Sequence, residues 1–120
     1  MVDPRMTSLL KKAADLTEND RISWKEAEKE DAFLASFTAY SLKIASRASR
    51  MDPNSTEYFL SILDEWGEVI EEVGDEEFDD GGATFMAMKG MFDKARRGSR
   101  GVDKALDSLL DDLDDLDVPK

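Results

Sequence analysis

The stretch from Ser55 to Gly74 reads STEYFLSILDEWGEVIEEVG and carries the most continuous apolar pattern of the chain. Its large apolar residues recur at steps of three and four, the spacing that places side chains on one face of an α-helix. Asn54 or Ser55 can cap the start, Glu57 can return a capping hydrogen bond, and Gly74 can end the helix. We therefore predict a helix over 55–74. Its apolar stripe consists of Phe59, Ile62, Leu63, Trp66, Val69, Ile70 and Val73.

Similar patterns predict four further helices, over about 4–17, 24–51, 83–97 and 100–117. The first begins at Pro4, a residue that suits the first helical turn, and the second opens with the capping sequence Ser23-Trp-Lys-Glu26. Because the connections are short, consecutive helices should pack antiparallel. We predict an all-α fold, a four- to five-helix antiparallel bundle that forms a single acidic domain over residues 1–120.

The last predicted helix carries a narrow apolar seam on a very acidic background. The seam follows a four–three repeat and consists of Val102, Leu106, Leu109, Leu113 and Leu116. Such a seam can complete the chain's own bundle, or it can zip onto a partner helix and form a homo-oligomer. We favour the intramolecular arrangement, because only three other apolar faces are available to close the core.

Composition excludes several classes of function. The 120 residues have a formal net charge of −12 and contain neither Cys nor His. Negative charge repels phosphates and anionic lipid, so we expect no direct binding to nucleic acid or membrane. The usual general base, thiol nucleophile and transition-metal ligands are missing, so we expect no catalytic site, no metal site and no cofactor. No stretch resembles a signal peptide or a membrane span, and we expect a cytoplasmic protein.

Charge is unevenly distributed along the chain. From residue 51 to 88 there is no Lys or Arg, but there are twelve Asp and Glu. On the predicted helix 55–74, several of these carboxylates fall on one edge, opposite the apolar stripe. Lys43, Arg47 and Arg50, on the preceding helix, can neutralise part of that edge. We predict that this acidic ridge binds the basic surface of a partner protein. Its members are Glu57, Asp64, Glu68, Glu71, Glu72, Asp75, Glu76 and Asp79.

A ridge of this kind can also be the solvated face of an acidic or salt-adapted protein. We hypothesise a non-enzymatic protein–protein interaction module, a small acidic regulator or inhibitor of phage or bacterial type that can mimic nucleic acid. The leading alternative is a structural or assembly factor, such as a phage scaffold or tail chaperone, or a self-associating helical protein. In that alternative the leucine seam and the methionines Met86, Met88 and Met91 make the contacts.

The segment EWGEVIEEVGD, residues 65–75, supplies a third hypothesis. It resembles the carboxylate helix of all-α nucleotide pyrophosphohydrolases, which hold Mg²⁺ with one pair of acids on one helix and a second pair on the next. The resemblance implies a Mg²⁺-dependent hydrolase. It departs from the family pattern at Trp66, which stands in place of an acid, and the following predicted helix offers only Asp93 for the second pair.

Overall fold

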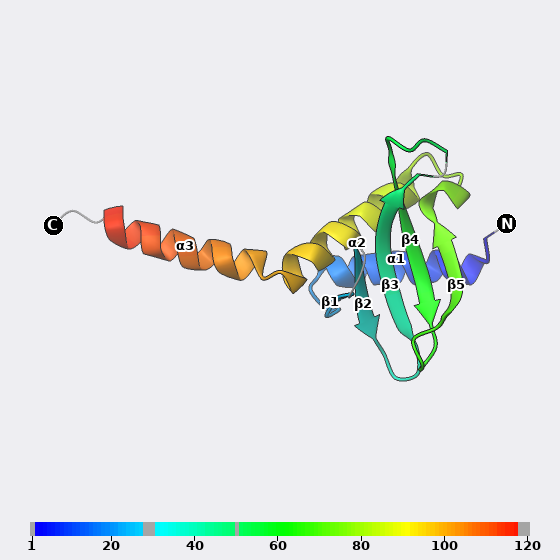
Figure 1. Ribbon diagram of the computed structural model, residues 1–120, viewed down its shortest axis with the longest axis horizontal. Helices are drawn as coiled ribbons and strands as arrows, with labels where there is room; N and C mark the ends of the chain where they lie inside the picture. Colours follow the sequence, from blue (N-terminus) through cyan, green and yellow to red (C-terminus); the bar gives the residue numbers. More distant parts are fainter. Residues whose placement is uncertain (1, 28–30, 50, 118–120) are drawn as a thin grey trace.

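The computed structural model describes residues 2–27, 31–49 and 51–117, and it overturns the predicted all-α bundle. Within these ranges the chain has an α+β fold, with a five-stranded antiparallel sheet and three α-helices (Figure 1). The elements in chain order are α1 (Pro4–Glu18), β1 (Lys25–Glu26), β2 (Ala32–Ser36), β3 (Ser41–Ala48), β4 (Thr56–Leu63), β5 (Val69–Gly74), the short 3-10 helix η1 (Asp75–Glu77), α2 (Ala83–Ser99) and α3 (Val102–Asp117).

Three of the predicted helices are present, close to the bounds expected for 4–17, 83–97 and 100–117. The two central predictions, over 24–51 and 55–74, are wrong, because these segments form the five strands of the sheet. Arg50 and residues 28–30 of the first segment lie outside the described residues.

The stretch 55–74 forms the hairpin of β4 and β5, and β4, which is buried on both faces, hides the strand pattern. Along β4, Tyr58 and Leu60 face the helices, whereas Phe59 is buried on the opposite face. Burial on both faces removes the alternation that marks a half-exposed strand and leaves a run that imitates helical spacing.

The β4–β5 turn has its own local determinants. Asp64 Oδ1 accepts hydrogen bonds from the backbone N–H groups of Trp66 at 3.0 Å and Glu68 at 2.9 Å. Gly67 has a φ of 83°, a left-handed conformation that glycine adopts without steric cost. Trp66, which we predicted in the core, lies in this turn and is 79% exposed.

The strands pair in chain order, β1-β2-β3-β4-β5, and every neighbouring pair is antiparallel. The register aligns one apolar row across the sheet, from Phe33 to Ile44, Leu60 and Val73. Both α1 and α2 lie on the face that carries this row (Figure 1).

Helix α2 covers the centre of that face. Its Met88, Met91 and Phe92 are buried, and the Phe92 ring meets Phe33 edge-on with centroids 5.3 Å apart. Of the methionine set, Met88 and Met91 therefore belong to the core, whereas Met86 is exposed. The hydrophobic core thus lies between α2 and the sheet.

Helix α1 contributes Met6, Leu10 and Ala13 to the same core, and it packs mainly against α2. Trp24 follows α1 and is buried; its indole Nε1 donates a hydrogen bond of 3.1 Å to Thr17 Oγ1. This bond ties the chain leaving α1 back onto the last turn of the helix.

Helix α3 projects from the end of α2 and buries none of its residues (Figure 1). The molecule is consequently elongated, with extents of 66 × 34 × 26 Å. The predicted packing of this helix into the chain's own core is wrong, because α1, α2 and the sheet close the core without it. No helix in the described ranges is both long enough and apolar enough to cross a membrane.

Gly74, at the end of β5, lies close against the Glu57 side chain, and this contact leads to a stability prediction. A Cβ atom at Gly74 would overlap Glu57 Oε2 and lie 2.9 Å from Phe59 Cε1. We expect Gly74→Ala to lower the free energy of unfolding by about 1–3 kcal/mol through overpacking. Gly90, in α2, has no neighbour within 4 Å of an added Cβ, so Gly90→Ala should raise it by about 0.5–1 kcal/mol. Urea denaturation measures the free energy of unfolding of both variants. An equal change in the two would contradict the close packing of Gly74 against Glu57.

Candidate functional site

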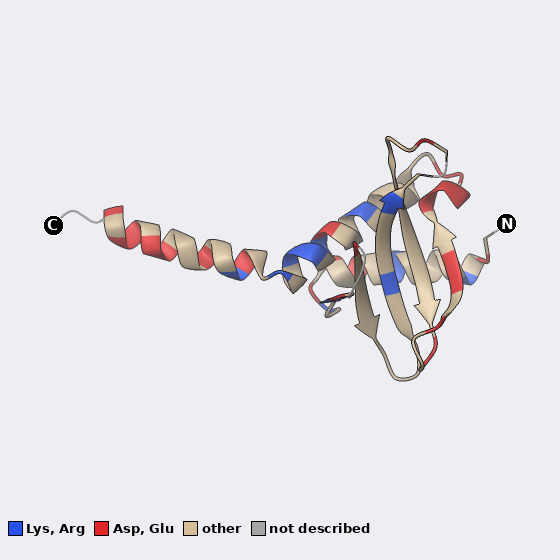
Figure 2. Ribbon diagram, in the orientation of Figure 1, with Lys and Arg blue, Asp and Glu red and all other residues tan. Residues whose placement is uncertain are grey.

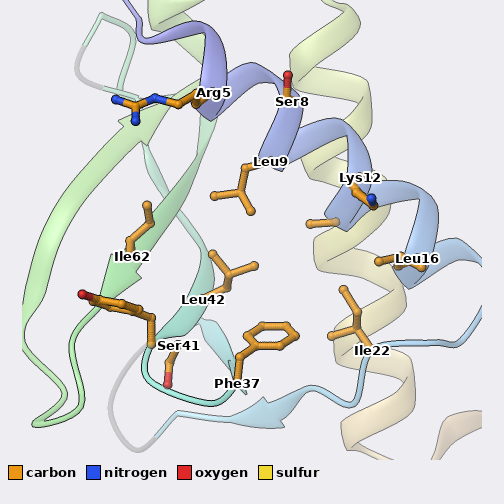
Figure 3. A pocket seen from close by; sticks show the side chains of 12 residues that line it. Arg5, Ser8, Leu9, Lys12, Leu16, Ile22, Phe37, Ser41, Leu42 and Ile62 are labelled. Atoms are coloured by element: carbon orange, nitrogen blue, oxygen red, sulfur yellow. The ribbon is translucent and has the colours of Figure 1, made fainter.

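An apolar groove opens between α1 and the end of the sheet that carries the β2–β3 turn (Figure 3). Its volume is about 520 Å³, within the range of sites that bind ligands or partner side chains. Side chains from α1, the segment after it, the β2–β3 turn and the central strands converge on this space. The apolar ones that define it are Leu9, Leu16, Ile22, Phe37, Leu42 and Ile62.

The groove exists because one set of apolar side chains on α1 points into the core and another set points into the groove. Met6 and Leu10 are buried in the core, whereas Leu9 and Leu16 turn toward the groove. The spacing between Leu9 and Leu16 is seven residues, which places them on the same side of the helix. Leu16 falls within the predicted helix 4–17, whereas Phe37 in the opposing wall falls within the predicted helix 24–51, which is wrong. The sequence therefore indicated one wall of the groove and missed the other.

Positive charge borders the groove on the α1 side, where Arg5 and Lys12 lie on its lining. Arg5 donates from Nη2 to Asp3 Oδ2 at 2.8 Å and from Nε to Asp3 Oδ1 at 3.2 Å. Within the described ranges, Lys12 forms no ion pair. An apolar trough with cations on one edge suits an amphipathic ligand that combines aliphatic groups with carboxylates.

Helix α3 is a second candidate surface, and here the predicted interface residues are all exposed or partly exposed. The leucines of the seam are 46–83% exposed, from Leu106 to Leu116, and Leu110 beside them is 57% exposed. Val102 is partly exposed at the start of the helix. Seven aspartates and the single cation Lys104 occupy other positions of α3, and Figure 2 shows the acidic residues along its length.

The predicted acidic ridge does not exist as one edge of a helix. Glu57 is fully buried in β4, Glu72 lies in β5, Asp64 organises the β4–β5 turn and Asp75 is buried in η1. The structure therefore distributes the eight carboxylates over two strands, a turn, a 3-10 helix and the segment after it. Four of them are exposed, namely Glu68, Glu71, Glu76 and Asp79.

Arg47 neutralises one of these carboxylates, as the sequence predicted for this cation. Its Nη1 and Nη2 donate to Glu72 Oε1 and Oε2 at 3.0 and 3.1 Å, and Ser61 Oγ donates to Glu72 Oε2 at 2.8 Å. The guanidinium also lies over the Phe59 ring, 4.5 Å from its centroid. The hydrogen bonds from Arg47 hold the pKa of Glu72 below its usual range.

Two further carboxylates serve the fold around η1. Asp75 accepts a 2.6 Å hydrogen bond from the backbone N–H of Tyr58, and burial raises its pKa. Glu76 accepts a hydrogen bond from Ser49 Oγ. These contacts join η1 to β4 and to the end of β3, so both carboxylates have structural partners within the chain.

The exposed carboxylate Glu68 immediately precedes β5, an edge strand of the sheet, and the exposed Glu71 lies within this strand. Charged side chains on an edge strand discourage pairing with strands of other molecules. This role explains their presence without requiring a partner.

The resemblance to nucleotide pyrophosphohydrolases fails on the fold. Residues 65–75 form the β4–β5 turn, β5 and the first residue of η1, so no carboxylate helix is present there. Across the described residues, no three carboxylates gather in a way that would hold a metal ion.

No protein-family model, no curated protein and no solved structure matches this chain.

The Arg47–Glu72 pair generates a pH prediction. Because the folded pKa of Glu72 is lowered, its ionised form stabilises the protein at pH values above the ordinary pKa of a glutamate, and this contribution is lost as the pH falls from there through the lowered pKa of the folded state. Glu72→Gln should cost about 0.5–1 kcal/mol at neutral pH, since the pair is partly exposed, and little at low pH.

Urea denaturation at a series of pH values measures this difference. Glu68→Gln, at the exposed start of the same hairpin strand, is the matched control and should leave the pH profile unchanged. A cost of Glu72→Gln that stays constant down to low pH would show that the carboxylate charge is not the stabilising feature.

Proposed function

We propose that the protein is a non-enzymatic protein–protein interaction module that docks α3 on a partner whose apolar surface is bordered by cations. One observation carries the proposal: the fold buries no residue of α3, although the helix has a continuous seam of leucines. Exposed apolar patches of this kind are typical of interaction sites. A small acidic regulator or inhibitor is the class of protein that fits this surface.

The spacing of the seam suits docking in a groove. Leu106, Leu109, Leu113 and Leu116 follow steps of three and four, the pattern by which an amphipathic helix inserts its anchors into a partner's groove. Burial of one leucine side chain contributes about 1.5–3 kcal/mol of transfer free energy, before the costs of association. The seam therefore offers enough apolar surface for a specific complex.

Charge selects the partner. Seven aspartates against one lysine make α3 strongly negative, which attracts a basic surface and repels an acidic one. Glu68, Glu71 and Asp79 add exposed negative charge elsewhere on the body of the molecule. We further propose that the protein works in the cytoplasm. The chain has no Cys, and proteins of this reducing compartment rarely rely on disulfides.

A second function, as an assembly factor that associates with copies of itself, is favoured by a specific observation. The chain carries, on its own body, an apolar groove bordered by Arg5 and Lys12, which has the chemistry that α3 requires of a partner.

Affinity capture from the cells that make the protein tests the docking role of α3. Leu109→Asp combined with Leu113→Asp should reduce the recovery of partner proteins at least tenfold, because it places two charges in the seam. Ser108→Asp is the matched control: it adds a charge on the opposite side of α3 and should retain the partners.

Recovery with the unmodified chain should also fall as salt rises from about 0.1 to 0.5 M, where the Debye length is roughly halved. Equal recovery of the same partners by the double variant would contradict the proposed function.

A further inference from the structure

We propose that α3 of one copy docks in the α1–sheet groove of a second copy. The second copy docks its own α3 in the groove of the first, so that the two contacts form a twofold-symmetric dimer. The inference rests on the proposed function, since it takes α3 to be a docking helix and names its partner. Two features that the monomer leaves uncovered, the leucine seam and the groove, would then cover each other.

The two surfaces match in chemistry. The groove presents Phe37 and Tyr40, both more than half exposed, together with Leu16, and α3 presents leucines. Lys12 and Arg5 border the groove, whereas aspartates flank the seam. Apolar contact in the middle with opposite charges at the rim is the arrangement of a specific interface.

The junction between α2 and α3 directs α3 away from its own groove. Arg97 Nη2 lies 2.6 Å from Asp103 Oδ1, and Gly101, in the left-handed region at φ 66°, separates the two helices. The backbone N–H of Gly101 donates to Gly98 O, and that of Ala105 donates to Gly101 O. Folding α3 back onto the same chain would break this junction, whereas docking in a second copy preserves it.

Pairing of α3 with α3 is disfavoured by charge. Each helix has seven aspartates and one lysine, so two such helices side by side bring like charges together along their length. The groove instead offers cations to the same aspartates. Electrostatics therefore selects the groove over a second α3 as the partner of the seam.

The position of the groove allows each copy to dock its α3 in the groove of the other at the same time. Ile22 lines the groove and also the small cleft that reaches Lys94 and Gly98, near the end of α2 from which α3 departs. The groove thus extends toward the side of the body where α3 begins. A helix of 16 residues is about 24 Å long, so two copies facing each other can each extend α3 across the partner's groove. A twofold axis then makes the two contacts identical.

Sedimentation velocity of the full chain and two variants tests the dimer. The helix variant carries Leu109→Asp and Leu113→Asp, and the groove variant carries Leu16→Asp and Phe37→Asp, four positions that are all exposed in the monomer. The unmodified chain should sediment at twice its 13.5 kDa mass at micromolar concentration. Each variant alone should be monomeric, since the reciprocal dimer loses both contacts in either case.

An equimolar mixture of the two variants provides the decisive measurement. The groove variant keeps an intact α3 and the helix variant keeps an intact groove, so one contact is restored and a heterodimer should form, at least tenfold weaker than the original dimer. Thermal melting of each variant, compared with the unmodified chain at a concentration below dimerisation, confirms that the body remains folded.

Other outcomes overturn the proposal. A groove variant that still dimerises would show that α3 pairs with α3. An unmodified chain that stays monomeric at all concentrations, or a mixture that does not associate, would exclude the second copy. If the chain is monomeric while the helix variant still loses its cellular partners, only this inference fails; if the helix variant retains those partners, the proposed function fails.

Discussion

The packing of α2 onto the centre of the sheet is the interaction on which the rest of the structure depends. Ile44, Leu60 and Met88 are fully buried there, and the aligned row across four strands gives α2 a continuous apolar bed. With α2 in that place, α1 packs chiefly against α2 and covers only part of the same face. The β2–β3 end stays open as a groove, and the core closes without α3. Both candidate interaction surfaces follow from this single arrangement.

The helices could be predicted from the sequence, whereas the sheet could not. Pro4 and the leucine repeat from Leu106 to Leu116 are local signals, and each marks a helix that is present. The strands lack such signals because residues 57–61 of β4 are buried consecutively, so alternation between the two faces disappears. The turn at Asp64-Glu-Trp-Gly67 is a local sign of a hairpin. It was missed because these residues fall within the apolar stripe that was assigned to a helix.

One candidate surface could be predicted from the sequence, and the other could not. The α3 seam is contained in one short segment, so its residues could be identified from spacing alone. The groove requires Leu9 and Phe37 to line the same space, and only the tertiary packing of α1 beside the β2–β3 turn places them there. The acidic ridge failed because charges assigned to one helix edge alternate between the faces and ends of strands, where Glu57 and Asp75 are buried and Glu72 is bonded to Arg47.

The separation of α3 from the core has a consequence for how this protein can change over generations. Residues that hold a fold together are constrained by every neighbour they touch, whereas the leucines and aspartates of α3 have few neighbours in their own chain. Replacements along this helix can therefore change the exposed surface of the protein while its ability to fold is unaffected. The surface of α3 is therefore free to vary on a body that stays the same.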